Sequence, residues 1–194
     1  MDLMDRIAAT THGWDPNPDR VLVALSGGVD SSVCVRILQE QGFAVEGLVI
    51  AFSPAHGAAV AAAQKSAQEL GVPLAVLNCE PLFDKEVVEP FCQSYAAGET
   101  PNPCVVCNPM VKFRILAEEA DRRGIRYIAT GHYARVTERD GLYYIATPQS
   151  VARDQSSMLY RLGQDILERL CLPLGEFDKD EIREMARALH LSCA

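Results

Sequence analysis

The chain has 194 residues, of which 48% are hydrophobic and 23% charged, and its formal net charge is −8 at pH 7. This size and composition predict one sizeable α/β domain with a normal core, and the lack of a run of about 18 apolar residues excludes a membrane-spanning helix. The negative charge opposes general attraction to nucleic acid, so RNA binding would need a local basic face. The N-terminus has no signal-peptide pattern, so we expect a cytoplasmic protein.

Helices and strands are predicted to alternate along the first two thirds of the chain. The predicted elements are strand 21–25, helix 31–41, strand 43–52, helix 56–70, strand 72–78, helix 81–95, loop 96–103, helix 109–123 and strand 127–130. This alternation is typical of an open parallel sheet with helices on both faces and right-handed crossovers.

The last third predicts a hairpin followed by helices. Segments 134–137 and 142–147 flank a turn, and the tail from Asp154 is expected to form two or three helices interrupted by Pro173 and Gly175. We therefore expect three parts: an N-terminal helical extension at 1–19, a nucleotide-binding α/β domain at 20–150 and a small helical C-terminal segment at 151–194.

A glycine loop follows the first predicted strand directly. Its sequence, Leu-Ser-Gly-Gly-Val-Asp-Ser-Ser over residues 25–32, predicts a phosphate cradle, because the glycines let the backbone bend and backbone N–H groups and serine hydroxyls can face an anion. It has neither the Walker pattern nor the dinucleotide pattern. The alternative is an ordinary turn between a strand and a helix. Because ligands bind at the carboxyl ends of parallel strands, this loop and the Gly131-His132 loop are expected to share one crevice.

A second signal is a cysteine pair, Cys104 and Cys107, in a segment rich in proline. Lys112 and the start of a predicted helix lie close behind, which favours a stabilised thiolate. From spacing alone, half of a zinc site, a redox pair and a catalytic thiol all stay open, although the lack of a second pair disfavours a closed zinc site. Seven cysteines without an export signal indicate thiols or metal ligands rather than disulfides.

The order of these motifs resembles the tRNA-specific 2-thiouridylase (MnmA) family of the PP-loop ATP pyrophosphatases, over about residues 20–194. The blocks that carry the resemblance are 26–32, 100–108 with 112–113, 129–135, 154–156 and 174–175. The resemblance implies an ATP- and Mg²⁺-dependent sulfurtransferase that adenylates O2 of the wobble uridine in tRNA. A cysteine persulfide, charged by a sulfur donor such as a cysteine desulfurase or a relay protein, would then deliver sulfur to C2.

The resemblance also implies roles for individual residues. Cys107 would be the nucleophile and Cys104 its catalytic neighbour, and a [4Fe–4S] cluster on the two is an alternative, with a third ligand open among Cys79, Cys92, Cys171 and Cys193. Asp30 would lie near the pyrophosphate and Mg²⁺. The expected ATP-binding residues are Ala24, Leu25, Ser26, Gly27, Gly28, Val29, Asp30, Ser31, Ser32, Ile50 and Gly131. The expected tRNA-binding residues are Asn102, Pro103, Cys104, His132, Arg153, Asp154 and Gln155.

Family members continue into a second catalytic cysteine and further tRNA-binding domains, so the resemblance is to a short form. Three hypotheses follow. The chain thiolates tRNA, alone, as an oligomer or with a partner subunit; it is a short paralogue that thiolates a smaller acceptor; or it is a non-catalytic nucleotide- or metal-binding module. No membrane partner is expected.

Overall fold

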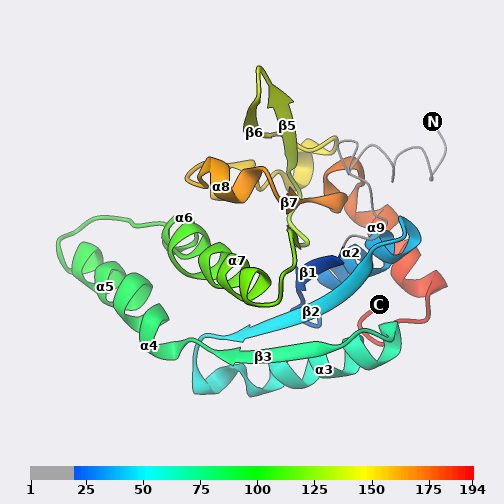
Figure 1. Cartoon of the computed structure of the whole chain (residues 1–194). Helices are drawn as coiled ribbons and strands as arrows, with labels where there is room; N and C mark the ends of the chain where they lie inside the picture. The colour runs from blue at the N-terminus through cyan, green and yellow to red at the C-terminus, as the bar shows by residue number, and fades with distance from the viewer. Residues whose placement is uncertain (1–19) are drawn as a thin grey trace.

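The computed structural model describes residues 20–194 and shows a parallel sheet between two layers of helices (Figure 1). The expected extension at 1–19 lies outside the described residues. The main sheet has the order β3-β2-β1-β4-β7, and β5 and β6 form a separate hairpin. The predicted open parallel α/β sheet is confirmed.

The elements follow one another with short connections. The strands are β1 (Arg20–Ala24), β2 (Ala44–Ala51), β3 (Leu74–Asn78), β4 (Tyr127–Ala129), β5 (Arg135–Arg139), β6 (Leu142–Ala146) and β7 (Leu170–Cys171). The helices are α2 (Val29–Glu40), α3 (Gly57–Leu70), α4 (Glu80–Phe83), α5 (Glu89–Ala96), α6 (Pro103–Cys107), α7 (Phe113–Arg122), α8 (Gln164–Leu167) and α9 (Lys179–Ala188). Wider π-helical turns, Asp84–Val88 and Asn108–Lys112, join α4 to α5 and α6 to α7. Single 3₁₀ turns are Pro54–His56, Val151–Arg153, Ser156–Met158 and Pro173–Glu176.

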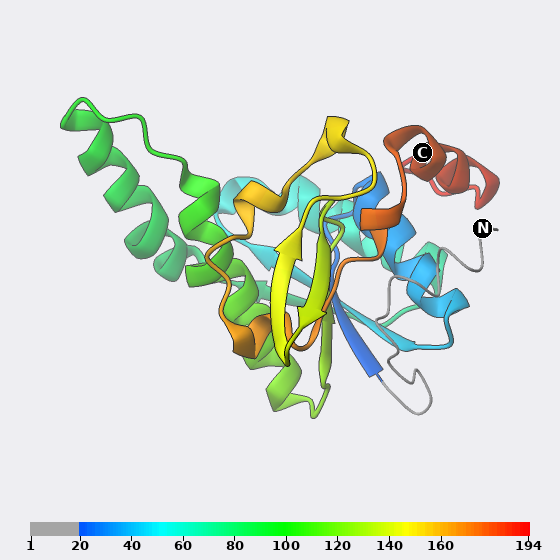
Figure 2. The same ribbon diagram turned by 90° about the horizontal axis from the view of Figure 1, so that it is seen from above.

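The central strand β1 is buried on both faces, which explains its unbroken run of apolar residues. Val21 and Val23 belong to a core cluster shared with α2, α3 and α9. Leu22 points the other way, into a cluster shared with α7 and α8. The α4–α5 arm extends away from this body (Figure 2). Within residues 20–194, no helix is both long and apolar enough to cross a membrane.

The helix that carries the cysteine pair begins earlier than predicted. It was expected at residue 109, but α6 begins at Pro103, where the Asn102 side chain accepts a hydrogen bond of 3.1 Å from the Cys104 N–H. Asparagine as the N-cap and proline in the first turn are standard helix-start signals. Cys104 and Cys107 therefore lie on a helix and not in a loop.

The tail contains a strand that the sequence analysis did not predict. Leu170 and Cys171 form β7, which pairs in parallel with Ile128 and Ala129 of β4. Two residues are too short to show a strand period, so only pairing with β4 identifies them. The hairpin is confirmed as antiparallel, with a tighter turn than expected, because Asp140 and Gly141 both adopt positive φ angles as a two-residue type I′ turn requires.

Candidate functional site

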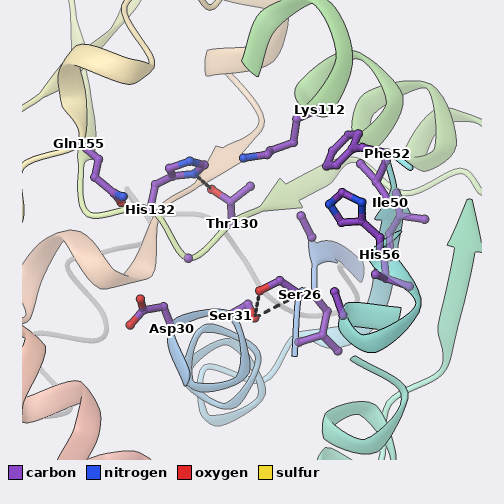
Figure 3. Close-up of a pocket in the computed structure, with 16 residues that line it drawn as sticks. Ser26, Asp30, Ser31, Ile50, Phe52, His56, Lys112, Thr130, His132 and Gln155 are labelled. Carbon is purple, nitrogen blue, oxygen red and sulfur yellow. Dashed lines mark hydrogen bonds between the residues drawn. The ribbon is translucent and has the colours of Figure 1, made fainter. Parts of the chain in front are cut away.

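A pocket of about 370 Å³ lies at the carboxyl ends of β1, β2 and β4 (Figure 3). The chain runs from β1 outward to β2 on one side, whereas β4 lies on the other, so the pocket sits where the strand order reverses. The sequence-predicted residues that line it are Ala24, Leu25, Ser26, Asp30, Ser31, Ile50, Gly131, His132 and Gln155. The glycine loop and the Gly131-His132 loop thus share one crevice, as predicted.

The glycine loop is held by its own serines. The Ser26 N–H donates to Ser31 Oγ at 3.2 Å, and the two hydroxyl oxygens lie 3.1 Å apart (Figure 3). Ser31 and Ser32 also donate to the Gly28 carbonyl, at 3.1 and 3.0 Å. Because the first amides of a helix have no intrahelical acceptor, the start of α2 offers N–H groups and a positive dipole end to an anion. This arrangement fits the phosphates of a nucleotide.

Two glycines allow the loops to approach neighbouring backbone. At Gly27, which has φ +78°, an added Cβ would lie 2.4 Å from the Ala62 carbonyl carbon and from the Ala63 nitrogen on α3. At Gly131, an added Cβ would lie 3.0 Å from backbone atoms of Asp30 and Ser31. Larger residues at these positions would push the pocket walls apart.

The opposite side of the pocket is apolar and aromatic. Ile50 at the end of β2 is joined there by Phe52 and His56, whose rings meet edge to face at 5.7 Å. A hydrogen bond of 2.8 Å between His56 Nδ1 and Ser53 Oγ orients the imidazole. A flat apolar wall opposite a phosphate cradle fits a purine base. Sequence analysis missed Phe52 and His56, which only the fold brings beside Ile50.

Asp30 is the carboxylate of the cradle. Its Oδ1 accepts a hydrogen bond of 2.8 Å from the Tyr133 hydroxyl and also forms an ion pair with Lys179 of α9. Mg²⁺ in nucleotide sites is bound by one or two carboxylates together with substrate phosphates, so a single aspartate beside the cradle fits that ion.

His132 is a neutral, oriented imidazole at the back of the pocket. Its Nδ1 lies 2.7 Å from Thr130 Oγ1, and its ring stacks on Phe113 at 5.9 Å between centroids. Burial, with a smaller effect of the nearby Lys112 cation, lowers the pKa of His132 to about 3. At neutral pH, His132 therefore acts as a hydrogen-bonding group and carries no charge.

Cys107 does not line the pocket, but Lys112, five residues later, does. The Lys112 cation lies close enough to act on the Cys107 thiol. Burial raises the pKa of Cys107, and the Lys112 cation offsets only part of this effect. The expectation of a stabilised thiolate was therefore wrong: the sequence shows the nearby lysine, whereas burial depends on the fold.

The remaining predicted residues lie outside the pocket wall. Asn102, Pro103, Cys104, Arg153 and Asp154 are exposed, and the last two follow the hairpin. Gln155, which does line the pocket, accepts a hydrogen bond of 2.9 Å from the Tyr133 N–H. A link that sequence analysis missed joins the cysteine helix to the tail, where the buried Asn108 amide donates to the Met158 carbonyl at 2.8 Å.

The donor set does not fit an iron–sulfur cluster. Among residues 20–194, no group of three or more His, Cys, Asp or Glu side chains lies close enough together to hold a metal ion. Cys104 and Cys107 thus have no third protein ligand in the described part of the chain, and a cluster requires one.

A parallel sheet with a Ser-Gly-Gly-x-Asp-Ser loop at its reversal point defines a nucleotide-binding domain of the PP-loop type. Residues 19–194 match the family model described as the tRNA methyl transferase HUP domain, and the chain belongs to this family. A solved structure, described as a predicted subunit of tRNA methyltransferase from Methanocaldococcus jannaschii, has the same fold. It aligns with a TM-score of 0.54 at 22% identity over 87% of this chain and 74% of its own.

Curated relatives with higher identity are named tRNA-specific 2-thiouridylase MnmA. The protein of Syntrophotalea carbinolica is 44% identical over 184 residues, which cover 90% of this chain and 51% of the relative. The protein of Carboxydothermus hydrogenoformans is 43% identical over 190 residues, covering 90% of this chain and 52% of the relative. The chain therefore spans about half the length of the curated relatives it matches.

Proposed function

We propose that this protein is an ATP-dependent sulfurtransferase that converts the wobble uridine of tRNA to 2-thiouridine. The observation that carries the proposal is Lys112, which lines the nucleotide pocket and whose positive charge acts on the Cys107 thiol. One residue thus joins the place where ATP would activate an oxygen to the place where sulfur would be held. The names of the relatives support tRNA as the acceptor.

The first half of the reaction uses the glycine loop. The triphosphate would lie over the first turn of α2, with the base against Ile50 and Phe52. Uridine O2 forms a bond to the α-phosphorus, the bond from that phosphorus to the bridging oxygen breaks, and pyrophosphate leaves while N3 loses its proton. Mg²⁺, when bound by Asp30 and the phosphates, neutralises charge on the pyrophosphate. Lys112 stabilises negative charge from the other side.

The second half uses the cysteine helix. A cysteine desulfurase or relay protein supplies a persulfide on Cys107, whose terminal sulfur attacks C2 of the activated uridine as AMP leaves. The Cys104 thiol then attacks the Cys107 sulfur, which breaks the sulfur–sulfur bond, releases 2-thiouridine and forms a Cys104–Cys107 disulfide. An external dithiol reduces this disulfide. Residues three apart lie on the same face of a helix, and Cys104 is exposed to such a reductant.

The acceptor would enter between the cysteine helix and the segment after the hairpin. Exposed Asn102, Pro103 and Arg153, together with Asp154, flank this side, while His132 and Gln155 line the interior. Because the net charge is −8, tRNA binding by these residues alone should be weak and strongly dependent on salt. A second copy or a partner subunit would strengthen it.

The proposal is tested by mass spectrometry of nucleosides from unmodified tRNA, incubated anaerobically with protein, ATP, Mg²⁺ and a persulfide donor. The wild-type protein should form 2-thiouridine and AMP. Cys107→Ser should form AMP but no 2-thiouridine, because adenylation does not need the thiol. The matched control is Cys92→Ser, an exposed cysteine on α5, which should behave as wild type. Thiolation that persists in Cys107→Ser would overturn the role of this cysteine, and the absence of both products in the wild type would overturn the function.

A further inference from the structure

The tail helix α9 reaches back to the glycine loop through one side chain. The Lys179 ammonium forms an ion pair with Oδ1 of Asp30, a residue 149 positions earlier in the chain. The same oxygen accepts the hydrogen bond from Tyr133. Within the described residues, the hydrogen bond and the ion pair of this carboxylate thus both fall on Oδ1, and Oδ2 is the oxygen available to a cation.

Lys179 is held in place before any ligand binds. Its side chain is 21% exposed, and its nitrogen lies 5.8 Å from the centre of the Tyr133 ring. It occupies the first turn of α9, which is capped by the Asp178 side chain, while the Asp178 N–H donates in return to the Glu181 carboxylate. The helix packs against α2, the helix that carries Asp30. A side chain so confined loses little further entropy when it holds its partner.

We infer that Lys179 is a positioning residue of the nucleotide site, which holds Asp30 by one oxygen so that the other binds the Mg²⁺ of a magnesium nucleotide. The inference rests on the proposed function, because it assigns Asp30 to a metal–phosphate complex. Lys179 does not line the pocket. It therefore acts through Asp30, which lines the pocket. Lys179 and Tyr133 together restrict rotation of the Asp30 carboxylate.

The experiment measures binding of two probes to the full chain by calorimetry. One is the magnesium complex of α,β-methylene ATP, which cannot be cleaved between its α- and β-phosphates, and the other is AMP, which has no pyrophosphate group. Lys179→Met should weaken binding of magnesium α,β-methylene ATP about tenfold, because loss of a hydrogen bond to a charged group costs about this factor. Binding of AMP should be unchanged. Lys85→Met, at a lysine that is 76% exposed on the arm, should change neither.

A double-mutant cycle separates positioning from direct contact. In an Asp30→Asn background, Lys179→Met should have no further effect, because the group through which it acts has lost its charge. Equal weakening in both backgrounds, no weakening in either, or a parallel loss of AMP binding would each overturn the inference and leave the proposed function standing. A wild-type protein that binds neither probe would overturn both.

Discussion

Replacement of Gly27 by alanine should separate the glycine loop from α3. The left-handed backbone at φ +78° costs a residue with a side chain about 1–2 kcal/mol. The new Cβ would lie 2.4 Å from two backbone atoms of α3, and relief of such a contact in a packed interior costs about 1–3 kcal/mol. Gly27→Ala should therefore lower the free energy of unfolding by about 2–5 kcal/mol in urea titrations, and the displaced loop should bind magnesium nucleotides more weakly.

The matched control is Gly57→Ala, at the first residue of the same helix. Its backbone is helical, with φ −53° and ψ −42°, and an added Cβ would meet no atom within 4 Å. This substitution should raise the free energy of unfolding by about 0.4–1 kcal/mol, because it reduces the freedom of the unfolded chain, and should leave nucleotide binding unchanged. If Gly27→Ala stays within about 0.5 kcal/mol of the wild type, the close approach to α3 is not a constraint and the reasoning fails.

Two further predictions concern the pKa values of the site. Burial lowers the pKa of His132 from 6.5 to about 3. Between pH 6.5 and about 3, the imidazole is therefore protonated in the unfolded chain and neutral in the folded chain. The free energy of unfolding should thus fall as pH drops from 6.5 toward about 3. His132→Gln should reduce the slope of this free energy against pH by up to about 1.4 kcal/mol per pH unit. Equal slopes for the two proteins in urea titrations would contradict this. Lys112→Met should raise the pKa of Cys107 further and slow its alkylation by iodoacetamide, measured by mass spectrometry with Cys92 as internal reference. Unchanged alkylation would show that the Lys112 cation does not act on this thiol, and Lys85→Met is the neutral control.

Much of the fold could be predicted because its signals are local. Three segments follow one another directly in the sequence: the apolar residues of β1, the glycine loop and α2. Their order places the loop at the carboxyl end of a parallel strand. The same rule placed Gly131 in the same crevice, and the pocket confirms it. The early start of α6 also has a local signal, because Asn102 and Pro103 are typical of a helix N-terminus. A loop was predicted instead because this segment is rich in proline.

Other features have no local signal. The strand β7 has only two residues and exists because β4 offers them hydrogen-bonding partners. Phe52 and His56 become a wall of the pocket only when β2 ends beside the glycine loop. Nothing near Lys179 in the sequence indicates that it pairs with a residue 149 positions away.

The sequence by itself therefore determined the class of fold, the glycine loop after the first strand and the presence of a cysteine pair close to a lysine, because each depends on residue type and short-range spacing. The tertiary structure decided the chemical state of these groups. It partly buried Cys107 and His132, and the loss of hydration shifts their pKa values. It also brought α9 against Asp30. Desolvation and ion pairing depend on the distances between groups and on the exclusion of water, and only the folded chain sets these.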